Sequence, residues 1–467
     1  MSTTDMSGTP TGGPPPLGRL VPRRSAGLKL ILVCALALAM AIPALFVYGV
    51  VHERTLGAER ALSEVSAKAG GRQSVLGPFL AVPYSRAPNP EKPEHIIYGI
   101  AVAFAGTGAI ETDVTAEERV RGIYRVPVFA ADISMAGELD PQALRDALPE
   151  DATPLWSDAR LYLGVTDPRG LRGEMDLRDG AARLDVEPVN HGYSQAGDYQ
   201  PVPWTGLNTL AAARIDGLAT RTAPLDLSVR FSLGGAERLA FAPSARDTVV
   251  EMTSNWESPS FTGAVLPVRH DAGESDVDGF TARWDVPYLA RGIAGAGSNI
   301  DLTQLTNWDA ADMAVRFVQP ANPYQSVERS LKYGAMFIGF VFLAWFLFEV
   351  TEKARAHPAQ YILLGLAQTI FYLLLLAFAE RMGFDLAFGI ASAMTVGLIA
   401  LYSANVFRSA AAGLKSLGVL AGIYALIYVL MRAEDHALLA GALASFIAIA
   451  LTMFMTRNVD WYGERDA

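Results

Sequence analysis

The residues most able to take part in chemistry are polar and ionisable side chains at the ends of long apolar segments. They are Glu349, Lys353, His357, Tyr361 and Glu380. A charge within a membrane segment is costly, so such a residue marks a candidate functional site. Glu349 precedes Lys353 by four positions, an order that favours an ion pair on one helical face. The structural alternative is ordinary helix-end pairing, with Glu349 beside Lys353 and Glu380 beside Arg381.

His357 is placed near this cluster by the residue that follows it. Pro358 disfavours helix at His357, so a turn should hold the imidazole close to the bilayer surface. Glu349, Lys353, His357 and Tyr361 are therefore a candidate coupling or binding site at one membrane face.

The sequence lacks the motifs that would indicate an enzyme. It contains no HExxH, CxxC, GxSxG or P-loop pattern, and its six histidines show no metal-ligand spacing. An acidic stretch with Asp271, Glu274, Asp276 and Asp278 could offer oxygen ligands to calcium, but it lacks the twelve-position grammar of a calcium loop. We expect a solvated acidic loop there, and we predict no catalytic residue, metal or cofactor.

Composition divides the chain into an acidic part and an apolar part. Hydrophobic residues make up 51% of the 467 residues and charged residues 18%. Residues 52–327 contain 37 acidic and 24 basic residues, a net charge of −13, and the remainder carries +3. No basic cluster suits a phosphate backbone, which argues against nucleic-acid binding. The single cysteine, Cys34, lies in the first apolar segment, so the acidic part forms no disulfide.

Six apolar segments are long enough to cross a bilayer. The first is 28–51, which we interpret as an uncleaved anchor. A disordered tail of residues 1–27 precedes it. The others are at about 331–350, 360–380, 384–405, 416–432 and 437–456, within a bundle of residues 328–456 followed by a tail, 457–467. Basic residues such as Arg408, Lys415 and Arg457 favour the same side as the N-terminus. Both termini are therefore predicted to be cytoplasmic.

Residues 52–327 have the pattern of a β domain. After a short amphipathic helix at Glu53–Ala69, apolar and polar residues alternate at 225–233 and 280–286, which indicates strands with one buried face. Further strands are expected at 96–104, 123–130, 160–166, 248–252 and 313–318. The fold class predicted is a membrane protein with six transmembrane helices, one N-terminal and five C-terminal, and a large, mainly antiparallel β domain, by default a sandwich, inserted between the first and second.

Several short motifs carry a family resemblance. In the bundle they are Lys332-Tyr333-Gly334, His357-Pro358-Ala359-Gln360-Tyr361 and Thr456-Arg457-Asn458-Val459-Asp460-Trp461-Tyr462. In the β domain they are Leu76-Gly77-Pro78, Arg121-Gly122-Ile123-Tyr124 and Asp167-Pro168-Arg169-Gly170. With these motifs the chain closely resembles the CreD family of bacterial inner-membrane proteins over nearly everything after the N-terminal tail.

The resemblance implies a multi-pass inner-membrane protein that supports cell-envelope integrity and the response to envelope or cell-wall-antibiotic stress. It implies no reaction and carries over no catalytic residue. We therefore expect a non-enzymatic binding or relay protein with a periplasmic β domain, the lipid bilayer around its helices, and an envelope protein or cell-wall precursor as partner. The alternative is a transporter or lipid-handling protein, and a transporter should show a polar cavity between helices.

Overall fold

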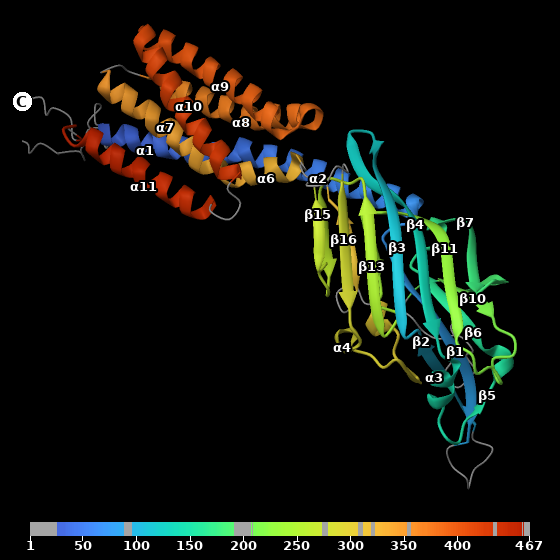
Figure 1. Cartoon of the computed structure of the whole chain (residues 1–467). Coiled ribbons are helices and arrows are strands. Elements are labelled where there is room, and N and C mark those ends of the chain that lie inside the picture. Colours follow the sequence, from blue (N-terminus) through green and yellow to red (C-terminus); the bar gives the residue numbers. More distant parts are fainter. Residues whose placement is uncertain are drawn as a thin grey trace, which may run out of the picture. The chain divides into compact units, whose positions relative to one another are not determined.

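The computed structural model describes residues 26–87, 96–190, 207, 209–272, 279–306, 312–318, 323–352, 356–432, 437–459 and 461. The chain divides into two compact units, drawn together in Figure 1. One unit is Gly57–Pro320, and the other combines Met1–Leu56 with Ala321–Ala467. The insertion of a large domain between the first apolar segment and the rest therefore follows the predicted organisation.

The unit that contains the termini is helical. Its helices are α1 (Ala26–Ala39), α2 (Ala41–Ala69, which continues into the other unit), α6 (Pro323–Lys332), α7 (Gly334–Thr351), α8 (Pro358–Met382), α9 (Phe384–Val406), α10 (Ala410–Arg432) and α11 (Ala437–Thr456). Within the described residues, six candidate membrane spans are found, with α1 and α2 counted together as Gly27–Ala69. The prediction of one N-terminal and five C-terminal spans is confirmed.

The first span differs from the prediction in its detail. Helix α1 ends at Ala39 and α2 begins at Ala41, with Met40 in a turn between them. Pro43 has no N–H to donate to the carbonyl four residues earlier, which accounts for a break at this position. Helix α2 then continues to Ala69, so the short helix expected at Glu53–Ala69 is the end of a longer one.

Small residues let the helices of the bundle approach closely. A Cβ atom at Gly413 of α10 would lie 2.7 Å from the Cβ of Ala404 in α9, and one at Gly365 of α8 would lie 2.4 Å from the sulfur of Met40. Large apolar side chains such as Leu398, Leu401 and Phe446 remain exposed. Lipid tails are the environment in which such a surface carries no cost.

The β domain contains two sheets within its described residues. The first has ten strands, of which seven follow the order β14-β18-β12-β1-β6-β10-β9, while β2 and β5 pair with β1, and β17 with β2. Their bounds are β1 (Gln73–Arg86), β2 (Ile97–Phe104), β5 (Thr153–Pro154), β6 (Arg160–Val165), β9 (Val186–Asn190), β10 (Thr209–Arg214), β12 (Arg238–Phe241), β14 (Pro259–Gly263), β17 (Ala296–Ser298) and β18 (Met313–Phe317).

The second sheet has eight strands in the described part, in the order β15-β16-β13-β3-β4-β11-β7-β8. Their bounds are β3 (Thr107–Arg121), β4 (Tyr124–Leu139), β7 (Leu171–Asp179), β8 (Ala182–Leu184), β11 (Leu225–Ala236), β13 (Asp247–Ser254), β15 (Arg269–Ala272) and β16 (Phe280–Val286). Pairing is antiparallel except between β1 and β12 and between β3 and β13. The expected mainly antiparallel domain is confirmed.

A hydrophobic core joins the two sheets. Side chains from both sheets, including Leu80 of β1, Leu161 of β6, Val229 of β11 and Trp284 of β16, belong to one buried cluster. On β11 the residues alternate between buried and more exposed positions from Leu225 to Leu233, as period two requires of a strand with one face in the core. Two packed sheets around one core make the domain a sandwich.

A second, smaller core covers the opposite face of the first sheet. Phe79 of β1, Val102 of β2 and Tyr162 of β6 pack there against Leu302 and Leu305. Short helices complete the domain. They are α3 (Pro141–Asp146), α4 (Tyr288–Arg291) and α5 (Thr303–Thr306), with the 3₁₀ turns η2 (Trp156–Asp158) and η3 (Pro168–Gly170). Helices α3 and α4 lie near the strand ends that form the pocket described below (Figure 1).

Candidate functional site

Glu349, at the C-terminal end of α7, is a buried carboxylate held by three groups. Its exposed fraction is 6%, and it forms an ion pair with Lys29 of α1. The Ala356 N–H donates to Oε1 at 2.9 Å, and the Tyr361 hydroxyl donates to Oε2 at 3.1 Å. Lys29 Nζ also donates to the Ala356 carbonyl at 3.0 Å. Glu349 thus connects the first span to α7 and to the start of α8.

His357 caps the helix that follows it, α8. Its Nδ1 accepts from the Ala359 N–H at 3.2 Å, and the Gln360 side chain accepts from the His357 N–H at 2.8 Å. This is a capping box at the N-terminus of α8, with Pro358 at the first helical position. The exposed imidazole therefore satisfies one backbone donor of its own helix, the Ala359 N–H.

Lys353 lies outside the described residues, so its pairing with Glu349 stays a prediction. The lysine that the structure places on Glu349 is Lys29, which was not among the residues predicted for this cluster. Lys29 lies at the cytoplasmic end predicted for the first span, and Glu349 lies at the same predicted face. The signal that could have suggested this pair is the presence of opposite charges at the predicted cytoplasmic ends of two spans.

The ring of Tyr361 extends the cluster into the bundle. It packs edge-on against Trp345 of α7, with ring centroids 5.6 Å apart. The Trp345 indole N–H donates to the Ser403 hydroxyl at 2.9 Å, and Ser403 contacts Ser416 at 3.0 Å. Polar contacts therefore connect α7, α8, α9 and α10, as polar residues do between membrane helices.

Glu380 lies apart from the Glu349 cluster, at the other end of α8. It is 19 residues from Tyr361 on α8, which at about 1.5 Å per residue separates them by roughly 28 Å. Arg54 Nε lies 3.9 Å from its Oε1, and the Tyr324 hydroxyl donates to the same oxygen at 3.3 Å. The structure brings Glu349 and Tyr361 together and places Glu380 at the other end of α8.

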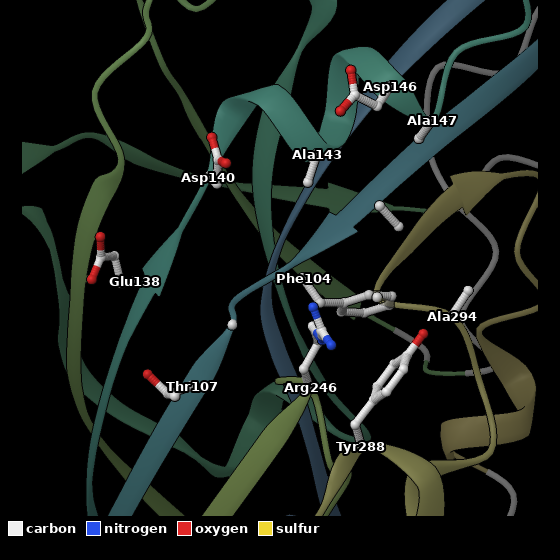
Figure 2. Close-up of a pocket in the computed structure, with 13 residues that line it drawn as sticks. Phe104, Thr107, Glu138, Asp140, Ala143, Asp146, Ala147, Arg246, Tyr288 and Ala294 are labelled. Carbon is white, nitrogen blue, oxygen red and sulfur yellow. The ribbon is translucent and has the colours of Figure 1, made fainter.

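A pocket of about 630 Å³ opens at one end of the β sandwich (Figure 2). Its lining comes from the ends of β2 and β4, the start of β3, helices α3 and α4, Arg246 before β13, and residues 294–296. The crossing from β2 to β3 takes the chain from the first sheet to the second, so the pocket lies where the sheets separate. Volumes of this order are typical of small-molecule sites.

One side of the pocket is aromatic and cationic. The Arg246 guanidinium lies over the Tyr288 ring, 4.4 Å from its centroid, and its stem packs against Gly295. Arg291, behind this side, lies over the Phe104 ring at 3.9 Å and is only 2% exposed. Burial lowers the pKa of the Arg291 guanidinium to about 10, so it remains protonated near neutral pH. We call Arg246, Tyr288, Arg291 and Phe104 the arginine side.

The other side carries carboxylates. Figure 2 shows Glu138 and Asp140 across the pocket from Arg246 and Tyr288, with Asp146 farther along α3. The Asp140 side chain caps α3 by accepting from the Gln142 N–H at 2.8 Å, and Asp146 accepts from the Gln142 side chain at 2.7 Å. We call these three acidic residues the carboxylate side. The sequence did not indicate this pocket, because its lining is drawn from separate segments of ordinary composition.

A hollow on the helical unit is apolar. A groove of about 500 Å³ is lined by α7, α10 and α11, and of the described side chains along it only Thr452 carries a hydroxyl. A polar cavity was the expected mark of a transporter, and this groove has the opposite character. Within the described residues, no three His, Cys, Asp or Glu side chains are grouped to hold a metal ion. Most of the acidic stretch at 271–278 lies outside that part of the chain.

The fold defines a class of protein: a multi-pass membrane protein with a large β sandwich between its first span and a bundle of five. The family model described as "Inner membrane protein CreD" matches residues 25–462, and the chain belongs to this family. It is 28% identical over 443 residues to Inner membrane protein CreD of Escherichia coli (strain K12), a match that covers 93% of each chain. The predicted family is confirmed.

Proposed function

We propose that this inner-membrane protein supports cell-envelope integrity as a binding protein, and that its β domain takes up a periplasmic ligand in the pocket between the arginine side and the carboxylate side. The observation that carries the proposal is the pocket itself. A cavity with a few convergent charged groups and aromatic rings is the usual form of a small-molecule site. The bundle then anchors the domain or relays its state.

The proposed orientation places the β domain in the periplasm and both termini in the cytoplasm. Support comes from basic residues in the loops predicted to be inside, among them Arg408, Lys415 and Arg457.

Binding without reaction is the simplest role for these side chains. Asp140 and Asp146 already accept hydrogen bonds that order α3, and Arg246 is held by the Tyr288 ring. Groups fixed in this way are suited to orienting a ligand, because little side-chain entropy is lost on binding.

The test fills the pocket without disturbing the core. Ala294 lines the pocket and is exposed, so Ala294→Trp should occupy the cavity and leave the sandwich intact. Ala182 on β8 is also exposed and lies outside the lining, which makes Ala182→Trp the matched control. In a strain without the chromosomal copy, Ala294→Trp should lower tolerance to a cell-wall-active antibiotic to the level of the deletion strain, and Ala182→Trp should restore it fully. Wild-type tolerance with Ala294→Trp, at equal membrane levels, would contradict the proposal.

Lipid handling is the second candidate, and the apolar groove between α7, α10 and α11 favours it. Its lining runs from Ala440 to Met455 on α11, about 22 Å at 1.5 Å per residue, which suits an extended acyl chain. Ala444→Trp would obstruct this groove. Loss of tolerance with Ala444→Trp but not with Ala294→Trp would favour the lipid-handling role over the binding role.

A further inference from the structure

We infer that the pocket binds a small zwitterion of peptide type, with its carboxylate at the arginine side and its amino group at the carboxylate side. This inference rests on the proposed binding function and names the ligand class. It draws on the separation of positive and negative groups across one cavity (Figure 2).

Arg246 supplies the direct contact for the ligand's anionic group. Its guanidinium stacks on Tyr288 and makes no side-chain hydrogen bond or ion pair within the part of the chain that the structure describes. The N–H groups of Arg246 are therefore available to a ligand. Those groups match the two oxygens of a carboxylate, which is the geometry of the strongest charge-assisted hydrogen bonds.

Arg291 strengthens the preference for an anion. Its Nε and both Nη atoms have no hydrogen-bond partner among the described residues, although the side chain is 2% exposed. A buried charge without a partner is costly, and an anion nearby reduces that cost. Because Arg291 lies against Phe104, which lines the pocket, its charge adds to the positive potential of the arginine side.

The carboxylate side selects the other end of the ligand. Glu138 is exposed and has no side-chain partner among the residues described, and Asp140 and Asp146 retain acceptor capacity beyond the bonds they make to Gln142. An ammonium group has three donors and a positive charge that suit these acceptors. A ligand with only negative groups would be repelled here, and one with only positive groups would be repelled at Arg246. A zwitterion satisfies both sides.

The experiment measures binding of four peptides of nearly equal size to the full-length protein in nanodiscs. The probes are tri-alanine, its N-acetyl form, its C-terminal amide, and the form capped at both ends. Tri-alanine should bind most tightly, and each cap should weaken binding about tenfold or more, because a hydrogen bond to a charged group is lost.

Variants assign each end. Arg246→Gln should abolish the preference for the free carboxylate over the amide and keep the preference for the free amine. Glu138→Gln should do the reverse. Arg230→Gln, on an exposed position of β11, is the control and should preserve both preferences.

Three results would overturn the inference: equal binding of all four probes, no binding of any of them, or unchanged preferences in both pocket variants. The proposed function is tested separately by Ala294→Trp. If that variant loses tolerance while none of the peptides binds, the pocket still functions and the ligand belongs to another class. If tri-alanine binds as expected but Ala294→Trp keeps full tolerance, the ligand class stands and the envelope role of the pocket fails.

Discussion

Lys29 and Glu349 are 320 positions apart in the sequence and form an ion pair between α1 and α7. Lys29 is 30% exposed and Glu349 only 6%. The lysine can therefore reach water without its partner, whereas the carboxylate cannot. This asymmetry determines which single substitution harms the bundle more.

Lys29→Met should destabilise the bundle more than Glu349→Gln does. The first change leaves a buried carboxylate without its cation, a loss that costs up to about 3–5 kcal/mol. In Glu349→Gln the amide still offers an acceptor to Ala356 or Tyr361, and Lys29 turns to solvent. The double variant should be more stable than Lys29→Met alone. Melting temperatures of the detergent-solubilised protein, followed by size-exclusion chromatography, measure the order. Equal melting temperatures for all three variants and the wild type would show that the ion pair does not contribute to the stability of the bundle.

Gly413 should tolerate no side chain, while Gly418 on the same helix should. A Cβ at Gly413 would meet Ala404 at 2.7 Å and the Ala400 carbonyl oxygen at 3.2 Å, and at Gly418 nothing lies within 4 Å. Gly413→Val should therefore separate α10 from α9 and cost about 1–3 kcal/mol. Gly418→Val carries the same β-branched side chain and should melt like the wild type. Similar melting temperatures for both variants would mean that α9 and α10 do not pack at Gly413.

The proposed orientation predicts opposite labelling of two exposed positions. In a Cys34→Ala background, Ala182→Cys in the β domain should react with an impermeant thiol reagent in cells whose outer membrane is permeabilised. Ala411→Cys, at the start of α10, should react only after lysis. Labelling of Ala411→Cys in unlysed cells would reverse the proposed orientation of that loop.

Protonation of the Asp167 carboxylate should make the β domain less stable in acid. Arg169 donates to its carboxylate at 2.6 Å, and this hydrogen bond holds the pKa of Asp167 below its usual value of 3.8. A lowered pKa in the folded state means that the stabilisation is complete above the unfolded pKa and disappears as pH falls through the folded one.

Asp167→Asn isolates this contribution, since asparagine can still cap η3. At about pH 7 the variant should be less stable by up to about 1 kcal/mol. The gap should begin to narrow as the pH falls below about 4, the pKa of the unfolded carboxyl, and should close only below the lower pKa of the folded state. Urea unfolding followed by the strand signal in circular dichroism measures both. A gap that stays constant to lower pH would assign the effect to shape rather than charge.

The sequence by itself determined the membrane topology class and the regular strands. A bilayer requires about 20 consecutive apolar residues and internally satisfied backbone groups, so each span is written locally in the chain. β11 and β16 were likewise predictable, because one face of each meets the core and the other meets water, and apolar and polar residues alternate in consequence.

Only the tertiary structure revealed β1, the strand at the centre of the first sheet. Residues of β1 such as Leu80 and Val82 face the core between the sheets, while Leu76, Phe79 and Ala81 belong to the smaller core on the opposite face. Both faces are buried, so no polar residue alternates and the period-two signal is lost. The same limit applies to function. The Lys29–Glu349 pair and the pocket between Arg246 and Glu138 join residues from distant segments, and local patterns contain no information about which distant segments meet.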